Sequence, residues 1–160
     1  MRKVVKFGGS SLASAEQFKK VGAIIRSDES RCFVVPSAPG KRYSDDIKVT
    51  DMLYGCYRTA EAGKDFSGEL KAIQERYDEI IQGLGLDLSL EEEFQVIEEN
   101  FKNHAGEDYA ASRGEFLNGK IMAAYLGFEF VDPAEGICFD ENGNFLADKT
   151  QEKMGERLAS

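Results

Sequence analysis

Residues 6–11 read KFGGSS and end a short apolar segment with a lysine, two glycines and two serines. Glycines at a strand end bring backbone N–H groups close to a ligand, because no Cβ keeps it away. A helix that follows directs its positive end to the same place, where anions bind. Lys6 could add a point charge to a phosphate held there. The alternative is a plain glycine turn with an exposed lysine and a serine cap.

The second polar stretch is SAPG, residues 37–40, which follows the next apolar run. If the two runs are parallel strands, their carboxyl ends lie at one edge of the sheet, where α/β proteins bind ligands. Ser37 would then lie near Gly8 and Gly9, and the two glycine-containing loops would form a polar pocket. Taken alone, SAPG is also consistent with an ordinary turn.

A third polar set lies within ASRGEFLNGK, residues 111–120, in a segment with helical spacing. Ser112, Glu115 and Asn118 are three residues apart and therefore share one helix face. The Glu115 carboxylate could accept hydrogen bonds from a substrate ammonium group, with space for the ligand beside Gly114. The alternative is a helix whose polar residues face solvent and whose Gly114 serves packing.

The elements that must position these residues follow from the spacing of apolar side chains. Two short apolar runs, residues 4–7 and 32–35, predict strands. Between them, residues 15–27 predict a helix, with Ser14 as its N-cap and Gln17 three residues later, as in a capping box. Because a helical crossover joins parallel strands, this β-loop-α-β unit predicts a parallel sheet.

The rest of the chain adds mainly helices to this unit. Helical spacing of apolar residues predicts helices over residues 50–62, 66–82, 90–103, 108–126 and 149–159. A further strand is predicted over residues 128–131, and Asn142-Gly143 predicts a hairpin turn. The fold class that follows is α/β, a mainly parallel sheet with helices on both faces, in an incomplete domain.

Composition excludes several classes of function. The 160 residues carry 29 acidic and 20 basic side chains, a formal charge of −9, which argues against a nucleic-acid partner. No segment approaches the roughly 18 consecutive apolar residues of a membrane span, and the start lacks the apolar core of a signal peptide. Cys32, Cys56 and Cys138 are widely spaced, which favours reduced thiols. We therefore expect a cytoplasmic protein with no membrane partner.

Four motifs occur together in the order found in aspartate kinases. They are KFGGSS after the opening strand, SAPG after the second, TDML at the start of the next helix and SRGE on a later helix. The chain therefore resembles the amino-terminal part of an aspartate kinase, in the amino acid kinase superfamily, over essentially all of its length. The resemblance implies the amino acid kinase fold. It also implies transfer of the ATP γ-phosphoryl group to the β-carboxylate of L-aspartate, giving 4-phospho-L-aspartate, the first step toward lysine, threonine and methionine.

The resemblance implies a role for each motif residue. The residues implied to hold the ATP phosphates are Lys6, Gly8, Gly9 and Ser10. Those implied to contact L-aspartate are Ser37, Thr50 and Glu115. Lys6 would be catalytic, because it would stabilise charge on the transferring phosphoryl group, while the glycines and Ser10 would act through backbone amides. Glu115 would bind the α-ammonium group, and Mg²⁺ would bind through ATP oxygens with no metal site on the protein.

Members of this family are longer than the present sequence. Their kinase domain continues into a GRGGSD-like segment and an adenine pocket, followed by two regulatory ACT domains, and none of these is found in residues 1–160. We therefore expect residues 1–160 to be the amino-terminal, amino-acid-binding part, inactive alone and self-associating as a homo-oligomer through exposed apolar surface. Two alternatives remain open: a kinase for another small acidic amino acid, and a non-catalytic truncated paralogue acting as a binding or dimerisation module.

Overall fold

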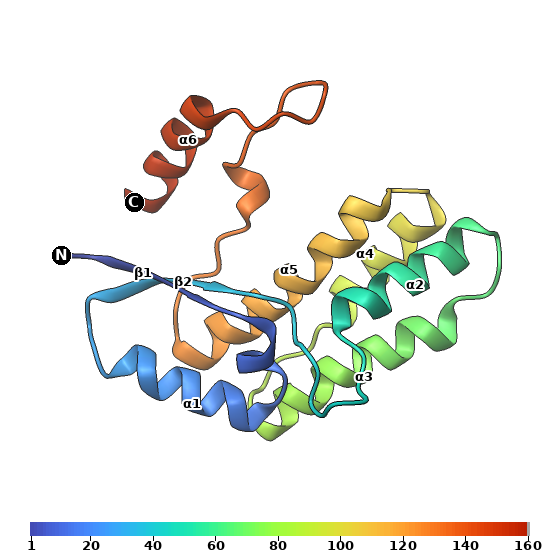
Figure 1. The fold of residues 1–160 in the computed structure, drawn as a ribbon, viewed down its shortest axis with the longest axis horizontal. Helices are drawn as coiled ribbons and strands as arrows, with labels where there is room; N and C mark the ends of the chain where they lie inside the picture. The colour runs from blue at the N-terminus through green and yellow to red at the C-terminus, as the bar shows by residue number, and fades with distance from the viewer. Residues whose placement is uncertain (160) are drawn as a thin grey trace. The chain divides into compact units, whose positions relative to one another are not determined.

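The computed structural model describes residues 1–159, which fall into two compact units, residues 1–128 and residues 129–159. The elements of the first unit are β1 (Lys3–Phe7), η1 (Gly9–Leu12), α1 (Ala15–Arg26), β2 (Arg31–Pro36), α2 (Val49–Glu61), α3 (Ser67–Gly83), α4 (Glu91–Lys102) and α5 (Glu107–Leu126). Those of the second are η2 (Pro133–Glu135) and α6 (Ala147–Ala159). Figure 1 shows the strands beside α1 and α5, with α2, α3 and α4 packed together in the rest of the first unit.

β1 and β2 are parallel, and α1 forms the crossover between them, as predicted. The pairing runs from Lys3 opposite Arg31 to Phe7 opposite Pro36. The start of α1 is fixed by Ser14, whose Oγ accepts a hydrogen bond from the Gln17 backbone N–H at 3.3 Å. This bond satisfies one of the free N–H groups of the first helical turn.

Helices cover one face of this small sheet. Val5, Phe7 and Val34 pack against the core. Val4 and Val35 point to the other side and are 69% and 46% exposed. The predicted α/β class with a parallel sheet is confirmed, but within the described residues the prediction of helices on both faces is met on one face only.

The second unit contains less regular structure than predicted. Residues 128–131 form no strand, because a strand needs a neighbouring backbone to pair with and no described residue supplies one. The predicted hairpin is present in a minimal form, as one antiparallel bridge between Phe139 and Phe145. Gly143 supplies the positive φ of its turn, at 80°.

The core of the first unit lies between helices and fixes α2 relative to α5. The Tyr57 hydroxyl accepts a hydrogen bond from the Gly106 N–H at 2.8 Å, and its ring packs edge-on against Phe101. The Tyr77 hydroxyl, fully buried, donates to the Gly114 carbonyl at 2.9 Å. Both tyrosines thus use their polar ends to hold α5 while their rings fill the core.

The two glycine-containing loops meet backbone to backbone. The Gly40 N–H donates to the Gly9 carbonyl at 2.8 Å. A Cβ on Gly9 would lie 2.8 Å from the Ala38 carbonyl oxygen, and a Cβ on Gly40 would lie 2.7 Å from the Gly9 carbonyl carbon. Gly8 differs from its neighbour, because a Cβ there would meet nothing within 4 Å. The glycine pair of KFGGSS therefore combines one packing glycine with one that is open to solvent.

Alanine at these adjacent glycines should have opposite effects on stability. We expect Gly9→Ala to lower the free energy of unfolding by about 1–3 kcal/mol, because the methyl group meets backbone atoms that cannot rotate away. Gly8→Ala is the matched control, with φ −77° in an ordinary extended region, and should raise stability by up to about 1 kcal/mol. Urea denaturation measures both, and equal effects of the two variants would contradict this assignment.

Candidate functional site

A cavity of about 450 Å³ opens at the carboxyl edge of β1 and β2. The residues that line it are Gly9, Ser10, Ser37, Ala38, Pro39, Gly40, Lys41, Lys48, Thr50 and Glu115. Among residues 1–159, the polar side chains of this lining have no hydrogen bond or ion pair. Hydroxyl, carboxylate and ammonium groups that are gathered in one cavity without partners are available to a ligand.

Four separate elements bring the predicted residues to this cavity. Ser10 comes from η1, Ser37 from the loop after β2, Thr50 from the first turn of α2 and Glu115 from the middle of α5. The co-location predicted for the two loops and the SRGE helix is therefore present, together with Gly9. The parallel strands are the cause, since both loops leave the sheet at the same edge.

Gly114 allows close packing of α5 and does not leave space for a ligand. A Cβ there would lie 2.6 Å from the Ala38 Cβ and 3.5 Å from Cδ1 of Leu53. The absence of a side chain thus lets α5 approach both the SAPG loop and α2. Of the two alternatives for this glycine, the packing one is correct, and its consequence is that Glu115, the next residue, reaches the cavity.

Asn118 holds the loop that carries Ser37. It is fully buried, and its Nδ2 donates to the Ser37 carbonyl at 2.7 Å. The Ser37 N–H in turn donates to the Phe7 carbonyl at 3.0 Å, so the loop is tied to both β1 and α5. Ser112 is exposed and bonds the Tyr109 carbonyl of its own helix. The polar face of the SRGE helix therefore points partly inward, against the alternative of a solvent-facing stripe.

Lys6 and Gly8 do not line the cavity. Lys6 is exposed and pairs in register with Val35, on the sheet face opposite to Val5 and Phe7. Gly8 begins the turn into η1 and is open to solvent. Both residues belong to the KFGGSS motif, whose Gly9 and Ser10 do line the cavity.

Two cavity residues, Lys41 and Lys48, were missed by sequence reasoning. They lie in the polar segment GKRYSDDIK that joins β2 to α2. The available signal was their position directly after a strand end, at the sheet edge already expected to bind ligand. No lysine of this segment is assigned to the site from the sequence.

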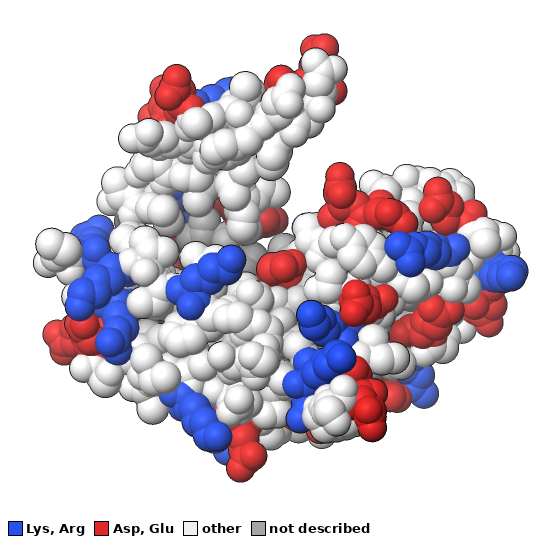
Figure 2. Space-filling view, viewed as in Figure 1, with Lys and Arg blue, Asp and Glu red and all other residues white. Residues whose placement is uncertain are grey.

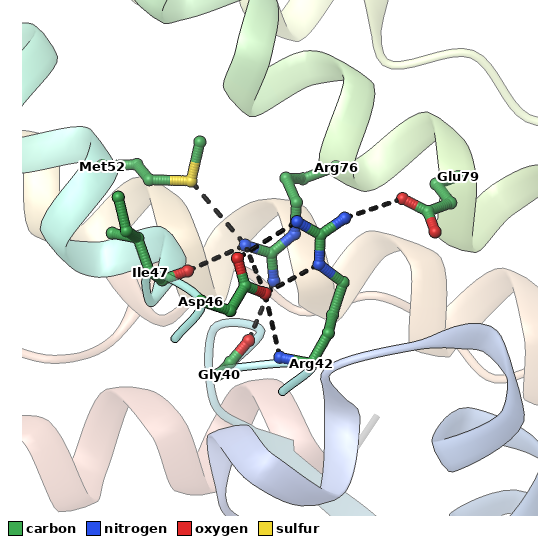
Figure 3. A network of polar contacts seen from close by, with 7 residues as sticks. All are labelled: Gly40, Arg42, Asp46, Ile47, Met52, Arg76 and Glu79. Atoms are coloured by element: carbon green, nitrogen blue, oxygen red, sulfur yellow. Dashed lines mark hydrogen bonds and ion pairs between the residues drawn. The ribbon is translucent and has the colours of Figure 1, made fainter. Parts of the chain in front are cut away.

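Arg76 organises that loop from α3 (Figure 3). The residue is only 5% exposed, and its guanidinium donates to the Gly40 carbonyl at 2.8 Å and the Ile47 carbonyl at 2.9 Å. Asp46 lies 3.6 Å from Arg76 and accepts from Arg42 Nε at 2.7 Å. One planar guanidinium thus joins the two ends of the loop.

The electrostatics of this network follow from its hydrogen bonds. The Arg42 guanidinium holds the pKa of the Asp46 carboxyl well below its usual range. Burial lowers the pKa of Arg76 from its usual value, but an arginine remains charged at neutral pH. The Asp46 carboxylate therefore stays ionised and balances two neighbouring cations.

A second cavity, of about 490 Å³, lies where α2 ends and α3 begins, and its lining includes Asp65, Lys102 and His104. It is the larger of the two, but some of its polar groups are already used. Asp65 accepts from the Ser67 N–H at 3.0 Å, and Lys102 is 3.0 Å from Glu98. We therefore take the cavity at the sheet edge as the functional site.

Neither a metal site nor a membrane span is found among the residues that the structure describes. No group of three or more His, Cys, Asp or Glu side chains there could hold a metal ion. None of the helices between residues 1 and 159 has the length and apolar character needed to cross a membrane.

Known proteins resemble this chain over nearly its whole length. Residues 1–154 match the amino acid kinase family. Aspartokinase 3 of Bacillus subtilis is 40% identical over 155 residues, covering 89% of this chain and 34% of the relative. Chloroplastic aspartokinase 1 of Arabidopsis thaliana is 32% identical over 133 residues, covering 77% of this chain and 23% of the relative.

Solved structures give the same result. The crystal structure of Clostridium acetobutylicum aspartate kinase superposes with a TM-score of 0.94 at 48% identity, covering 98% of this chain and 36% of that one. Escherichia coli aspartokinase III, solved with aspartate and ADP, has a TM-score of 0.80 at 20% identity over 99% of this chain and 38% of its own, which shows the fold alone. The chain spans about a third of the length of these relatives.

The Arg42–Asp46–Arg76 network should make stability depend on acid pH. Because folding lowers the pKa of Asp46, its contribution is present above the unfolded pKa of about 4 and is lost as pH falls further. Asp46→Asn should lower the free energy of unfolding by about 2 kcal/mol at pH 7, and less below pH 4. Asp45→Asn, an exposed neighbour without a hydrogen bond, is the control. Urea denaturation across pH measures both, and a pH-independent loss for Asp46→Asn would refute the coupling.

Proposed function

The chain belongs to the amino acid kinase family, and from this premise we propose that it is the amino-terminal, amino-acid-binding part of an aspartate kinase. The observation that carries the proposal is the cavity that gathers the motif residues Ser10, Ser37, Thr50 and Glu115, whose side chains have no hydrogen bond or ion pair within residues 1–159. The proposed reaction transfers the γ-phosphoryl group of ATP to the β-carboxylate of L-aspartate. Its product, 4-phospho-L-aspartate, leads toward lysine, threonine and methionine.

The cavity has the groups needed to orient the acceptor. Glu115 is the carboxylate of its lining and would accept hydrogen bonds from the α-ammonium group of aspartate. Ser37 and Thr50 supply hydroxyl donors from a loop and a helix N-terminus, both suited to a carboxylate. Holding the acceptor in one orientation is most of what a phosphoryl-transfer enzyme must do, because the protein forms no bond itself.

We assign binding of the ATP phosphates to the KFGGSS loop. Gly8 leaves its surroundings open, so a phosphate can approach the backbone of Gly8, Gly9 and Ser10 closely. Lys6 is exposed at the last turn of β1 and would neutralise charge as a phosphoryl group meets a carboxylate. These groups fit a nucleotide's phosphates, and Mg²⁺ would be held by ATP oxygens.

The proposal also includes the cellular location and the oligomeric state of the protein. We propose a cytoplasmic chain, in keeping with its unpaired cysteines. Its open sheet face, with Val4 and Val35 exposed, supports association with further polypeptide, including a second copy of the chain. This surface is the basis for expecting a homo-oligomer.

The acceptor assignment is tested by titrating the purified chain with L-aspartate in a calorimeter. Glu115→Gln keeps the shape of the side chain but removes its charge, so we expect about tenfold weaker binding of aspartate. Glu92→Gln, at an exposed and unpartnered position of α4, is the matched control and should bind as the wild type does. Equal affinities of the wild type and Glu115→Gln, or tighter binding of L-glutamate than of L-aspartate, would contradict the proposal.

The phosphate assignment is tested with Mg-tripolyphosphate, which carries the phosphates of ATP without the adenosine. Lys6→Ala should weaken its binding about tenfold while leaving the affinity for L-aspartate unchanged, because Lys6 lies outside the acceptor cavity. Lys19→Ala on α1 is the control, since that lysine is also exposed and unpartnered. A loss of aspartate binding in Lys6→Ala would instead place this lysine in the acceptor site.

A further inference from the structure

Lys41 and Lys48 are the basic residues of the acceptor cavity. Within residues 1–159 neither ammonium group has a hydrogen bond or ion pair. Figure 2 shows Lys and Arg side chains over the loop that joins β2 to α2, with acidic side chains beside them. The cavity thus concentrates positive charge in a protein whose formal charge is −9.

The backbone beside each lysine is fixed by the same guanidinium. Arg76 donates to the carbonyls of Gly40 and Ile47, and these residues directly precede Lys41 and Lys48. Asp46 binds Arg42 at 2.7 Å and lies 3.6 Å from Arg76, so the segment between the lysines is braced as well (Figure 3). Arg76 therefore fixes the backbone next to both lysines without lining the cavity itself.

The charges of the cavity lining form a simple pattern. The charged residues of the lining are one acid, Glu115, and two lysines, Lys41 and Lys48. A ligand with one ammonium and two carboxylates complements all three charges, whereas a neutral side-chain amide leaves one lysine unmatched. Of the residues assigned to the phosphates, Gly9 and Ser10 line the cavity whereas Lys6 and Gly8 lie outside it, so we take the lysine pair as ligands of the acceptor carboxylates rather than of a nucleotide.

We propose that Lys41 and Lys48 select the acceptor substrate by its two carboxylates. Arg76 is the positioning residue, because it fixes the backbone next to both lysines. The inference rests on the proposed function and names the substrate feature read by this site. A guanidinium suits the task, because its planar fork donates to two carbonyls at once, whereas a lysine provides a single point charge.

The lysine pair is tested with succinate, which has two carboxylates and no ammonium group. Lys41→Gln and Lys48→Gln should each weaken binding of succinate and L-aspartate about fivefold, and the double variant about 20-fold. L-asparagine should lose less affinity, because it lacks the second charge. Lys71→Gln, on the exposed side of α3, is the matched control and should change none of these affinities.

Arg76→Lys separates positioning from general stability. It should lower the preference for L-aspartate over L-asparagine to the level of the lysine double variant, and adding Lys48→Gln to it should then have little further effect. A purely structural role would weaken both ligands alike and leave their ratio unchanged. The thermal midpoint of each variant, recorded with and without aspartate, confirms that the folded state is being compared.

Each result has a stated consequence. Unchanged succinate affinity in the lysine variants would overturn the inference. The same holds if the variants bind inorganic phosphate more weakly but succinate as tightly as the wild type does. Absence of succinate binding by the wild type up to millimolar concentration would overturn it as well. If succinate binding depends on the lysines but Glu115→Gln leaves aspartate binding unchanged, the lysines bind carboxylates as inferred, whereas the acceptor assignment of the proposed function fails.

Discussion

The hydrogen bond from the Gly40 N–H to the Gly9 carbonyl, 2.8 Å long, joins the loops that follow β1 and β2. It forms only because neither residue has a Cβ, since either methyl group would press on backbone of the opposite loop. The positions of the two loops at the carboxyl edge of the sheet depend on this contact. Ser10 and Ser37 face one cavity because their loops are held together there.

The helices complete the site by reaching over these loops with buried polar groups. Asn118 of α5 and Arg76 of α3 bond the carbonyls of Ser37 and Gly40, so two helices hold the same short turn. Tyr77 joins α3 to α5 through the Gly114 carbonyl. Burying such groups is costly unless they are paired, and pairing them with loop carbonyls makes the loop geometry part of the core.

This arrangement suits a reaction between two anions. A carboxylate that attacks a phosphoryl group must be held close to it while the charge of both is neutralised. In the proposed function, the cavity carries groups that fit the acceptor, and the KFGGSS loop, whose Gly9 and Ser10 line the cavity, adds open backbone at Gly8 and the exposed Lys6. The protein contributes orientation and charge, which a rigid sheet edge provides well.

The sequence by itself determined what depends on neighbours along the chain: the β-loop-α-β unit, the Ser14 cap, the helices and the two glycine loops. Only the tertiary structure showed which glycine packs against backbone and that residues 128–131 lack a strand partner. It also showed that Arg76 donates to the Gly40 carbonyl 36 residues away, and Asn118 to the Ser37 carbonyl 81 residues away. Local spacing encodes helices and caps, because their bonds span a few residues. A buried arginine or asparagine finds its partner only when distant segments fold together, and no pattern in one sequence specifies that pairing.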